Sequence, residues 1–214
     1  MKKSYLAVIF IILLSFAAGA YFYPQLPDRM ASHWNDQGEV DGYMSKFWGV
    51  FLLPFILLGV FLLLAIIPKI DPLKGNIEKF RKYFDGFIVL FSLYFLYIYG
   101  LTIAWNLGKT FNFTFFMIPS MAVLFYYCGV MIENAKRNWF VGIRTPWTMS
   151  SEEVWDKTHR LGGRLFKAAG IIALLGLAFE EYAMAFIMGP VLFAAFYTFL
   201  YSYLEYRKIR NISS

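Results

Sequence analysis

The sequence predicts an all-α, polytopic membrane protein with six transmembrane helices and both termini in the cytoplasm. Three observations lead to this fold class. The chain is 59% hydrophobic and only 16% charged over 214 residues, and a soluble domain of that size could not bury so much apolar surface. Apolar runs of membrane-spanning length recur along the chain, and the basic residues gather in alternate loops.

Five apolar runs are long enough to span a bilayer. A hydrocarbon core roughly 30 Å thick needs about 20 helical residues. The sixth run, 165–179, is short, but Arg164 and Lys167 can extend it by placing their charged ends at the membrane surface. Glu180 and Glu181 are expected to end it in a tight hairpin. The five long runs are 5–23, 47–67, 87–105, 113–132 and 182–203.

The basic residues assign a side of the membrane to each loop. Of the 20 Lys and Arg residues, all but Arg29, Lys46 and Lys109 fall in alternate loops or at the two ends of the chain. Positively charged loops remain in the cytoplasm, so loop 24–46 is expected outside and loop 133–164 inside. No ionisable residue lies deep within a run, which disfavours a transporter or ion relay. Cys128, the single cysteine, is expected to be a small core residue.

The chain divides into three predicted modules: 1–67 with the outer loop, 68–132 with two central spans, and 133–214 with the inner loop. The first run could be mistaken for a signal peptide, because Ala18-Gly19-Ala20 resembles a cleavage site. Its length exceeds that of a typical signal-peptide core. We therefore expect a retained helix.

The outer loop, 24–46, is rich in turn-forming residues. The segment 35–38 suits a type I turn with glycine last, Asp41-Gly42 suits a second tight turn, and residues 30–34 could be extended. His33 is a candidate metal ligand with the nearby acids, although one histidine is a weak metal signal. The alternatives are a turn-capping role for the acids, with His33 and Trp34 packed on helix ends, or a docking surface for an external peptide. The acids are Asp28, Asp36, Glu39 and Asp41.

The inner loop is expected to be an irregular, held segment followed by an amphipathic helix. Pro146 disfavours helix at the residue before it, so 142–147 is predicted as a loop. The S-x-x-E sequence from Ser150 predicts a helix start, which would place Trp155 and His159 on one helical face. Arg144 could hold a carboxylate or phosphate, or it could anchor the loop at lipid headgroups. His159 has no sequence partner that would complete a catalytic set.

Together the two loops resemble the SdpI family, and the resemblance covers nearly the whole chain. Trp34 stands where phenylalanine is commoner in the family. The outer motif, expected to act in recognition, comprises Pro27, His33, Trp34, Asn35, Gly38, Asp41, Gly42, Tyr43, Ser45 and Lys46. The inner motif, expected to act in coupling, comprises Asn138, Gly142, Ile143, Arg144, Thr145, Pro146, Trp147, Trp155, Thr158 and His159.

The resemblance implies a bacterial immunity protein of the cell membrane, not an enzyme and without a cofactor. The implied partners are membrane lipid, a secreted peptide toxin outside, and a cytoplasmic transcriptional repressor held at the membrane, with no direct binding of nucleic acid. A second hypothesis is a metal-dependent hydrolase that uses His33 and the outer-loop acids. A third is a small transporter. The sequence leaves the oligomeric state open.

Overall fold

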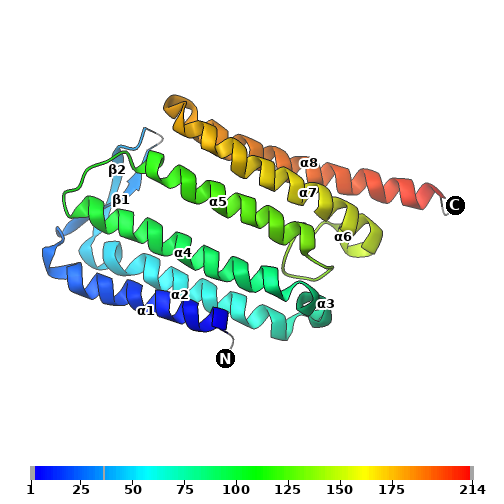
Figure 1. The fold of residues 1–214 in the computed structure, drawn as a ribbon, viewed down its shortest axis with the longest axis horizontal. Coiled ribbons are helices and arrows are strands. Elements are labelled where there is room, and N and C mark those ends of the chain that lie inside the picture. The colour runs from blue at the N-terminus through cyan, green and yellow to red at the C-terminus, as the bar shows by residue number, and fades with distance from the viewer. Residues whose placement is uncertain (1–2, 36, 213–214) are drawn as a thin grey trace.

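A computed structural model describes residues 3–35 and 37–212 and is mostly helical (Figure 1). Its long helices run side by side, and a two-stranded sheet lies at one end of the bundle. The α-helices are α1 (Lys3–Phe22), α2 (Lys46–Ile70), α3 (Lys74–Lys79), α4 (Arg81–Asn106), α5 (Phe113–Asn134), α6 (Pro146–Ser150), α7 (Glu152–Ala173) and α8 (Ala183–Ile212). The strands are β1 (Arg29–Trp34) and β2 (Val40–Ser45), and the 3-10 turns are η1 (Tyr23–Gln25), η2 (Leu174–Leu177) and η3 (Glu180–Tyr182).

Five helices in the described part of the chain are long and apolar enough to cross a membrane. They are α1, α2, α4, α5 and α8, and they contain, to within one residue at α1 and α8, the five long runs predicted from the sequence. Their outward surfaces carry exposed side chains such as Phe10, Leu63 and Phe196, which are 66%, 66% and 73% exposed. Exposed apolar surface on this scale is unfavourable in water and suits contact with lipid. The multi-pass membrane class is therefore supported by the structure.

The short sixth run has a different form from the one predicted. Residues 165–173 continue a single helix, α7, that begins at Glu152 in the inner loop. The helix then tightens into η2, and Glu180 begins η3, so the predicted hairpin at Glu180 and Glu181 is present. Because its first half contains charged residues, α7 is not one of the five apolar helices. Its 22 residues nevertheless extend for about 33 Å.

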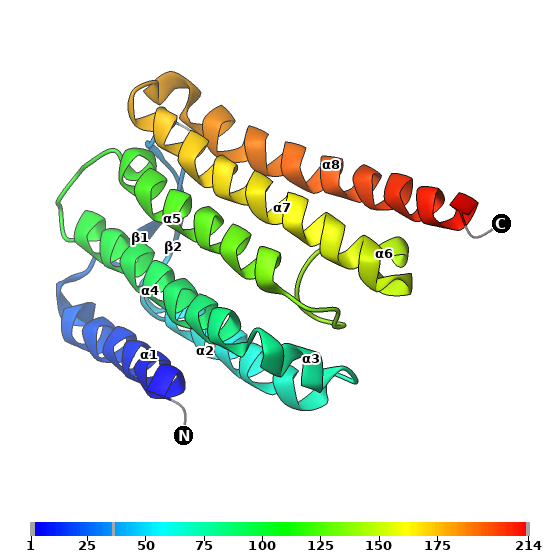
Figure 2. The same cartoon turned by 45° about the vertical axis from the view of Figure 1, so that its right-hand side comes forward.

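The bundle has two chemically distinct ends. In Figures 1 and 2, β1, β2, the α4–α5 connection and the α7–α8 turn lie at one end, while α3, α6 and both chain termini lie at the other. Helix α7 runs along α5 and α8 between these ends. The segments predicted to lie outside therefore share one end, and the segments predicted to lie inside share the other.

Glycines allow α5 and α7 to approach at backbone distance. A Cβ on Gly163 would lie 2.8 Å from the carbonyl oxygen of Gly129, and one on Gly170 would lie 2.5 Å from that of Ala122. The ion pair between Lys167 Nζ and Glu133, at 2.6 Å, joins the same two helices. Small residues favour such association in lipid, where the hydrophobic effect between helices is absent.

The outer loop forms an antiparallel hairpin, and residues 30–34 are extended as predicted. The turn at 35–38 is also supported, since the Gly38 amide donates to the Asn35 carbonyl at 3.0 Å. The second predicted turn is wrong: Asp41 and Gly42 lie within β2. Gly42 pairs with His33 beside a register shift, and a Cβ on Gly42 would lie 2.8 Å from the His33 Cβ. The glycine serves close strand approach instead of a turn.

Candidate functional site

The outer hairpin is fastened to the ends of α4 and α5 by side-chain amide and hydroxyl groups. Asn106 Oδ1 accepts from the Ala31 amide at 2.8 Å, and its Nδ2 donates to the Ala31 carbonyl at 3.0 Å. Thr114 Oγ1 donates to the Asn35 carbonyl at 3.2 Å. Hydrogen bonds on both groups of one residue hold a strand much as a neighbouring strand would. The hairpin is therefore an ordered cap on the bundle.

Trp34 is the main aromatic anchor of this cap. Its ring stacks on Phe113 with centroids 3.9 Å apart and meets Trp105 edge to face at 5.9 Å. The predicted packing of Trp34 on helix ends is thus confirmed. Its buried Nε1 has no hydrogen-bond partner among the described residues.

Beneath the hairpin lies an apolar groove of about 360 Å³, which we call the outer groove. It lies between α2 and α4 on one side and α5 and α8 on the other. Ser32, His33 and Trp34 form its upper edge, and helices contribute mainly apolar side chains below. These include Trp48 and Leu52 of α2, Ile98 of α4, Met117 of α5 and Met184 of α8. Clefts with an apolar lining and a few polar groups at one edge are the usual form of a ligand site.

His33 is exposed at the edge of this groove, and its Nδ1 is hydrogen-bonded to Asp41. Of the two residues expected to pack on helix ends, Trp34 does so, whereas His33 is mostly exposed. No group of three His, Cys, Asp or Glu side chains in residues 3–35 and 37–212 is arranged to hold a metal ion. Asp36 lies outside the described residues.

The remaining outer-motif residues divide into exposed and structural positions. Pro27, Tyr43 and Ser45 are exposed. Lys46 pairs with Asp28 at 3.2 Å and begins α2.

Gly38 has φ +80°, and a Cβ there would lie 2.3 Å from Asn112 Oδ1. The hairpin tip thus lies directly against the start of α5. Sequence reasoning missed Asn106, Asn112 and Thr114, although Asn112 could have been found as an N-cap, since its side chain accepts from the Phe115 amide.

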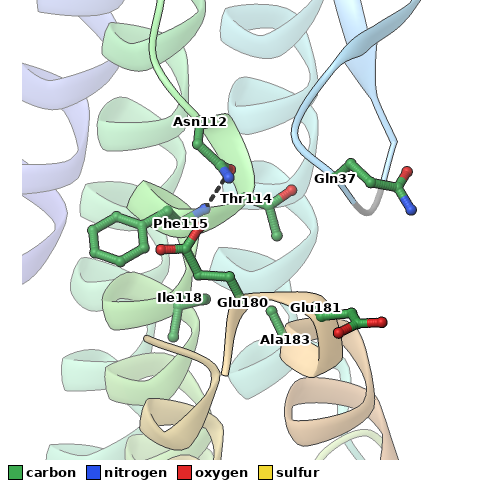
Figure 3. Close-up of a pocket in the computed structure, with 8 residues that line it drawn as sticks. All are labelled: Gln37, Asn112, Thr114, Phe115, Ile118, Glu180, Glu181 and Ala183. Atoms are coloured by element: carbon green, nitrogen blue, oxygen red, sulfur yellow. Dashed lines mark hydrogen bonds between the residues drawn. The ribbon is translucent and has the colours of Figure 1, made fainter. Parts of the chain in front are cut away.

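A second, polar pocket of about 260 Å³ lies beside the hairpin tip (Figure 3). Gln37 and Asn112 line one side, and Glu180 and Glu181 line the other. This pocket brings the α7–α8 turn next to the outer loop, although the two are more than a hundred residues apart in sequence.

At the opposite end of the bundle, Asn138 organises the inner loop. It is completely buried. Its Oδ1 accepts from the amides of Phe140 and Val141, and its Nδ2 donates to the carbonyls of Lys136 and Val141. Both acceptor positions and both donor positions of the side chain are therefore used. Asn138 stabilises the fold of the loop and has no free polar group for a ligand.

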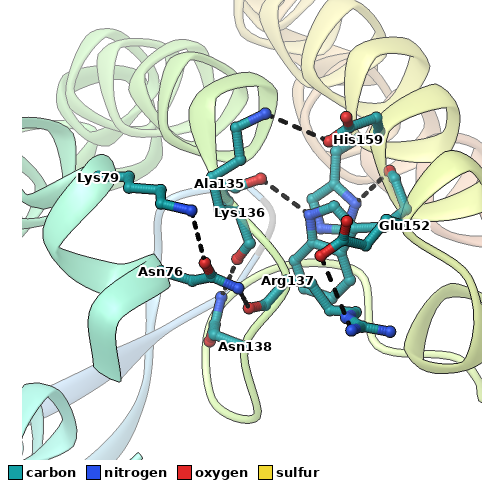
Figure 4. A network of polar contacts seen from close by, with 10 residues as sticks. Asn76, Lys79, Ala135, Lys136, Arg137, Asn138, Glu152 and His159 are labelled. Carbon is teal, nitrogen blue, oxygen red and sulfur yellow. Dashed lines mark hydrogen bonds and ion pairs between the residues drawn. The ribbon is translucent and has the colours of Figure 1, made fainter. Parts of the chain in front are cut away.

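The inner loop is joined to the α2–α4 connection by two residues that sequence reasoning missed. Asp71 is 2% exposed and accepts from the amides of Leu73 and Trp139. Asn76 Nδ2 donates to the Arg137 carbonyl at 2.9 Å (Figure 4). The bond to Leu73 is local, but no local pattern reveals the contacts with Trp139 and Arg137, which lie more than sixty positions away.

His159 supports the same loop from α7. Its ring stacks on Trp155 with centroids 3.8 Å apart, so the predicted shared face is confirmed. Nε2 lies 3.0 Å from the Ile143 amide and accepts from it, which requires the neutral ring with its proton on Nδ1. Nδ1 then donates to the Trp155 carbonyl at 2.8 Å. Gly142, at φ +111°, gives the ring this space, since a Cβ there would lie 2.4 Å from Nε2.

The helix starts of this region differ from the predicted ones. Helix α6 begins at Pro146, capped by Thr145 in a reciprocal pair with Thr148, so the irregular loop ends earlier than expected. Helix α7 is capped by Ser151 and not by Ser150. Both corrections follow from proline, which is favourable at the first position of a helix.

The other inner-motif residues fasten this segment to α8 or face outward. Thr145 Oγ1 lies 3.0 Å from Ser202 Oγ, and Trp147 packs on Phe199 and Tyr203. Thr158 is buried without a hydrogen-bond partner among the described residues.

Arg144, Trp139 and Phe140 are exposed, and we call them the inner surface. Arg144 Nη1 donates to the Trp139 carbonyl, which holds the three residues together. An exposed guanidinium beside exposed aromatic rings suits either a protein partner or a headgroup region.

Burial of His159 predicts an acid-sensitive fold. Desolvation lowers the pKa of the ring from 6.5 to about 4. Between pH 6.5 and pH 4 the His159 ring is protonated in the unfolded chain but neutral in the folded chain. Stability should therefore be fully present above pH 6.5 and fall by about 3 kcal/mol as the pH drops to 4. Unfolding of the detergent-solubilised protein, followed by tryptophan fluorescence against pH, measures this loss.

His159→Gln is the control for that measurement. Glutamine can still accept from the Ile143 amide but does not titrate. The difference in pH-dependent stability between wild type and variant gives the contribution of His159 separately from that of His33, the other histidine. An unchanged pH dependence in the variant would contradict the assignment.

Comparison with known proteins gives two family matches and one relative. A model of the SdpI/YfhL protein family matches residues 134–202, and a model of a domain of unknown function, DUF1648, matches residues 10–58. The chain is 28% identical over 212 residues to the Immunity protein SdpI of Bacillus subtilis (strain 168), with 99% of each chain covered. No solved structure matches the chain. The resemblance stated from the sequence is thereby confirmed.

Proposed function

We propose, starting from this SdpI resemblance, that the chain is an integral protein of the bacterial cell membrane that protects its producer from a secreted peptide toxin. The proposal also includes signalling, in which the inner surface holds a cytoplasmic transcriptional repressor at the membrane. No catalytic step is part of it. The observation that carries the proposal is the placement of the two motifs at opposite ends of one bundle, each as a fixed structure.

The proposed topology has six crossings with both termini in the cytoplasm. Five crossings are the apolar helices, and the sixth is the run 165–179, which comprises the second half of α7 and η2. Its helical part is packed between α5 and α8, and Lys167 is paired with Glu133. Paired charges and small residues at a helix interface are tolerated in a membrane. The location of both termini at the α3 and α6 end supports the even number of crossings.

The outer groove and hairpin are the proposed recognition surface. Trp48 lines the groove and is 51% exposed, so a large ring at this site is accessible to a partner. Exposed aromatic residues around a cleft are typical anchors of protein recognition. The apolar lining would accept apolar side chains of a peptide, while His33 and Asp41 offer hydrogen bonds at the edge.

A protection assay tests the proposed function. The chain is expressed in a toxin-sensitive host, and survival is measured against the cognate toxin. Trp48→Ala is expected to reduce protection at least tenfold, since loss of an exposed anchor removes about 2 kcal/mol of binding. Tyr21→Ala is the matched control, because Tyr21 is 71% exposed at the outer end of α1 and does not line the outer groove. Wild-type protein that gives no protection would refute the immunity role.

The membrane localisation of a fluorescent repressor tests the signalling part of the proposal. Arg144→Ala and Trp139→Ala should release a fluorescent repressor from the membrane while protection persists, because neither residue touches the outer groove. Repressor that stays at the membrane in both variants would refute the inner surface as the docking site and favour headgroup anchoring.

A further inference from the structure

A second groove, which we call the lipid groove, lies between α1 and α4, away from both motifs. Its volume is about 500 Å³, and its lining is almost wholly apolar. Leu14, Ala18 and Phe22 line it from α1, and Leu96, Gly100 and Ile103 line it from α4. Both helices are candidate membrane spans, so in a bilayer this groove faces hydrocarbon and has the form of an acyl-chain site.

A cationic side chain, Lys109, lies at the outer end of the groove. Gly108, at φ +90°, lies two residues after the end of α4. The Lys109 amide donates to the Ala104 carbonyl at 3.2 Å, and the Gly108 amide donates to Trp105 at 3.0 Å. This is a Schellman cap, which turns the chain back over the helix end. The cap explains why Lys109, which follows the helix, still lines the groove.

Lys109 differs from the other two basic residues on the outer side. Lys46 is paired with Asp28, and Arg29 lies over the Tyr43 ring. Lys109 is exposed and makes no ion pair or ring contact with another described residue. An exposed ammonium group at the mouth of an apolar groove complements a phosphate at the end of a hydrocarbon chain.

One residue of the lining, Tyr99, belongs to the packed core. It is 2% exposed, and its hydroxyl has no hydrogen-bond partner among the described residues. The hydroxyl is buried beside Gly19 of α1 and packs with Val50 of α2, so a lipid in the groove would not reach it. The polar end of a lipid would therefore be bound by Lys109 alone.

We propose that the lipid groove binds one anionic phospholipid, with an acyl chain along α1 and α4 and its phosphate at Lys109. This proposal is independent of the immunity function, because the lipid groove shares no residue with the outer groove or with the inner surface. A lipid here would stabilise the contact of α1 with α4.

Native mass spectrometry of the full chain in detergent, with added phosphatidylglycerol or phosphatidylcholine, tests the proposal. Gly100→Leu fills the groove, and a Cβ at Gly100 meets no atom within 4 Å, so the fold should tolerate it. Gly59→Leu is the matched control, since Gly59 is equally open on α2 and outside the groove. Phosphatidylglycerol binding should weaken about tenfold in Gly100→Leu and remain unchanged in Gly59→Leu.

Two further variants test the headgroup and the phenol. Lys109→Gln should abolish the preference for phosphatidylglycerol over phosphatidylcholine. Tyr99→Phe should leave lipid binding unchanged and raise the Tm of the protein, because it removes a buried polar group that has no hydrogen-bond partner among the described residues. Equal lipid binding by Gly100→Leu and Gly59→Leu would overturn the proposal. Loss of a dimer peak in Gly100→Leu with lipid binding intact would also overturn it, in favour of a second copy of this chain.

Discussion

Gly142→Ala is expected to destabilise the protein by about 4 kcal/mol. Strain from a β-carbon at φ +111° contributes about 1–2 kcal/mol. The rest arises because the new Cβ would lie 2.4 Å from His159 Nε2, which breaks the bond to the Ile143 amide and leaves buried groups unpaired. Urea unfolding in mixed micelles, monitored by tryptophan fluorescence, measures the loss.

Gly108→Ala separates the two contributions to this loss. Gly108 also has positive φ, at +90°, but a Cβ there meets no atom within 4 Å. It should therefore cost only the strain, about 1 kcal/mol. Equal losses in the two variants would show that the contact between Gly142 and His159 does not stabilise the inner loop.

Trp34→Ala is expected to cost about 4 kcal/mol and to abolish protection against the toxin. The change removes the stacked pair with Phe113 and the edge contact with Trp105, which anchor the hairpin over the outer groove. With that anchor gone, β1 is held to the bundle by the buried Met30 and by the hydrogen bonds of Asn106. Hydrogen exchange of the β1 amides and the protection assay provide the two measurements.

Trp34→Phe is the matched control. Phenylalanine keeps a ring against Phe113 and removes the unpartnered Nε1, so stability should change by less than about 1 kcal/mol. Full protection by Trp34→Ala would refute the hairpin as part of the recognition surface.

The membrane-spanning part of the fold could largely be predicted because its signal is local. A run such as 87–105 is apolar throughout, and only a helix satisfies its backbone in hydrocarbon. The run 165–179 was harder to assign, because α7 enters the bundle with its charges paired to residues of other helices, as Lys167 is with Glu133. Hydropathy measures the apolar character of one segment, and it undervalues a helix whose charged side chains are paired with those of its neighbours.

The two motifs could be located from sequence, but the roles of individual residues within them could not. Gly42 resembled a turn residue, yet it lies in a strand because His33 comes close on the partner strand. Asn138 resembled a coupling residue, yet its side chain is used up within its own loop. Such roles depend on which residue lies opposite, and that is set by pairing between strands and by loop closure.

The sequence by itself determined the membrane class, the five apolar helices, the two motif-bearing loops and the side of the bilayer expected for each, because hydropathy, charge and motif spacing are properties of local segments. Only the tertiary structure decided that Asn106 and Trp34 fix the hairpin over a groove, that Asp71 and Asn76 hold the inner loop, and that Lys109 lies at the mouth of a second groove. These contacts join segments far apart in the chain, and they exist only once the helices have packed.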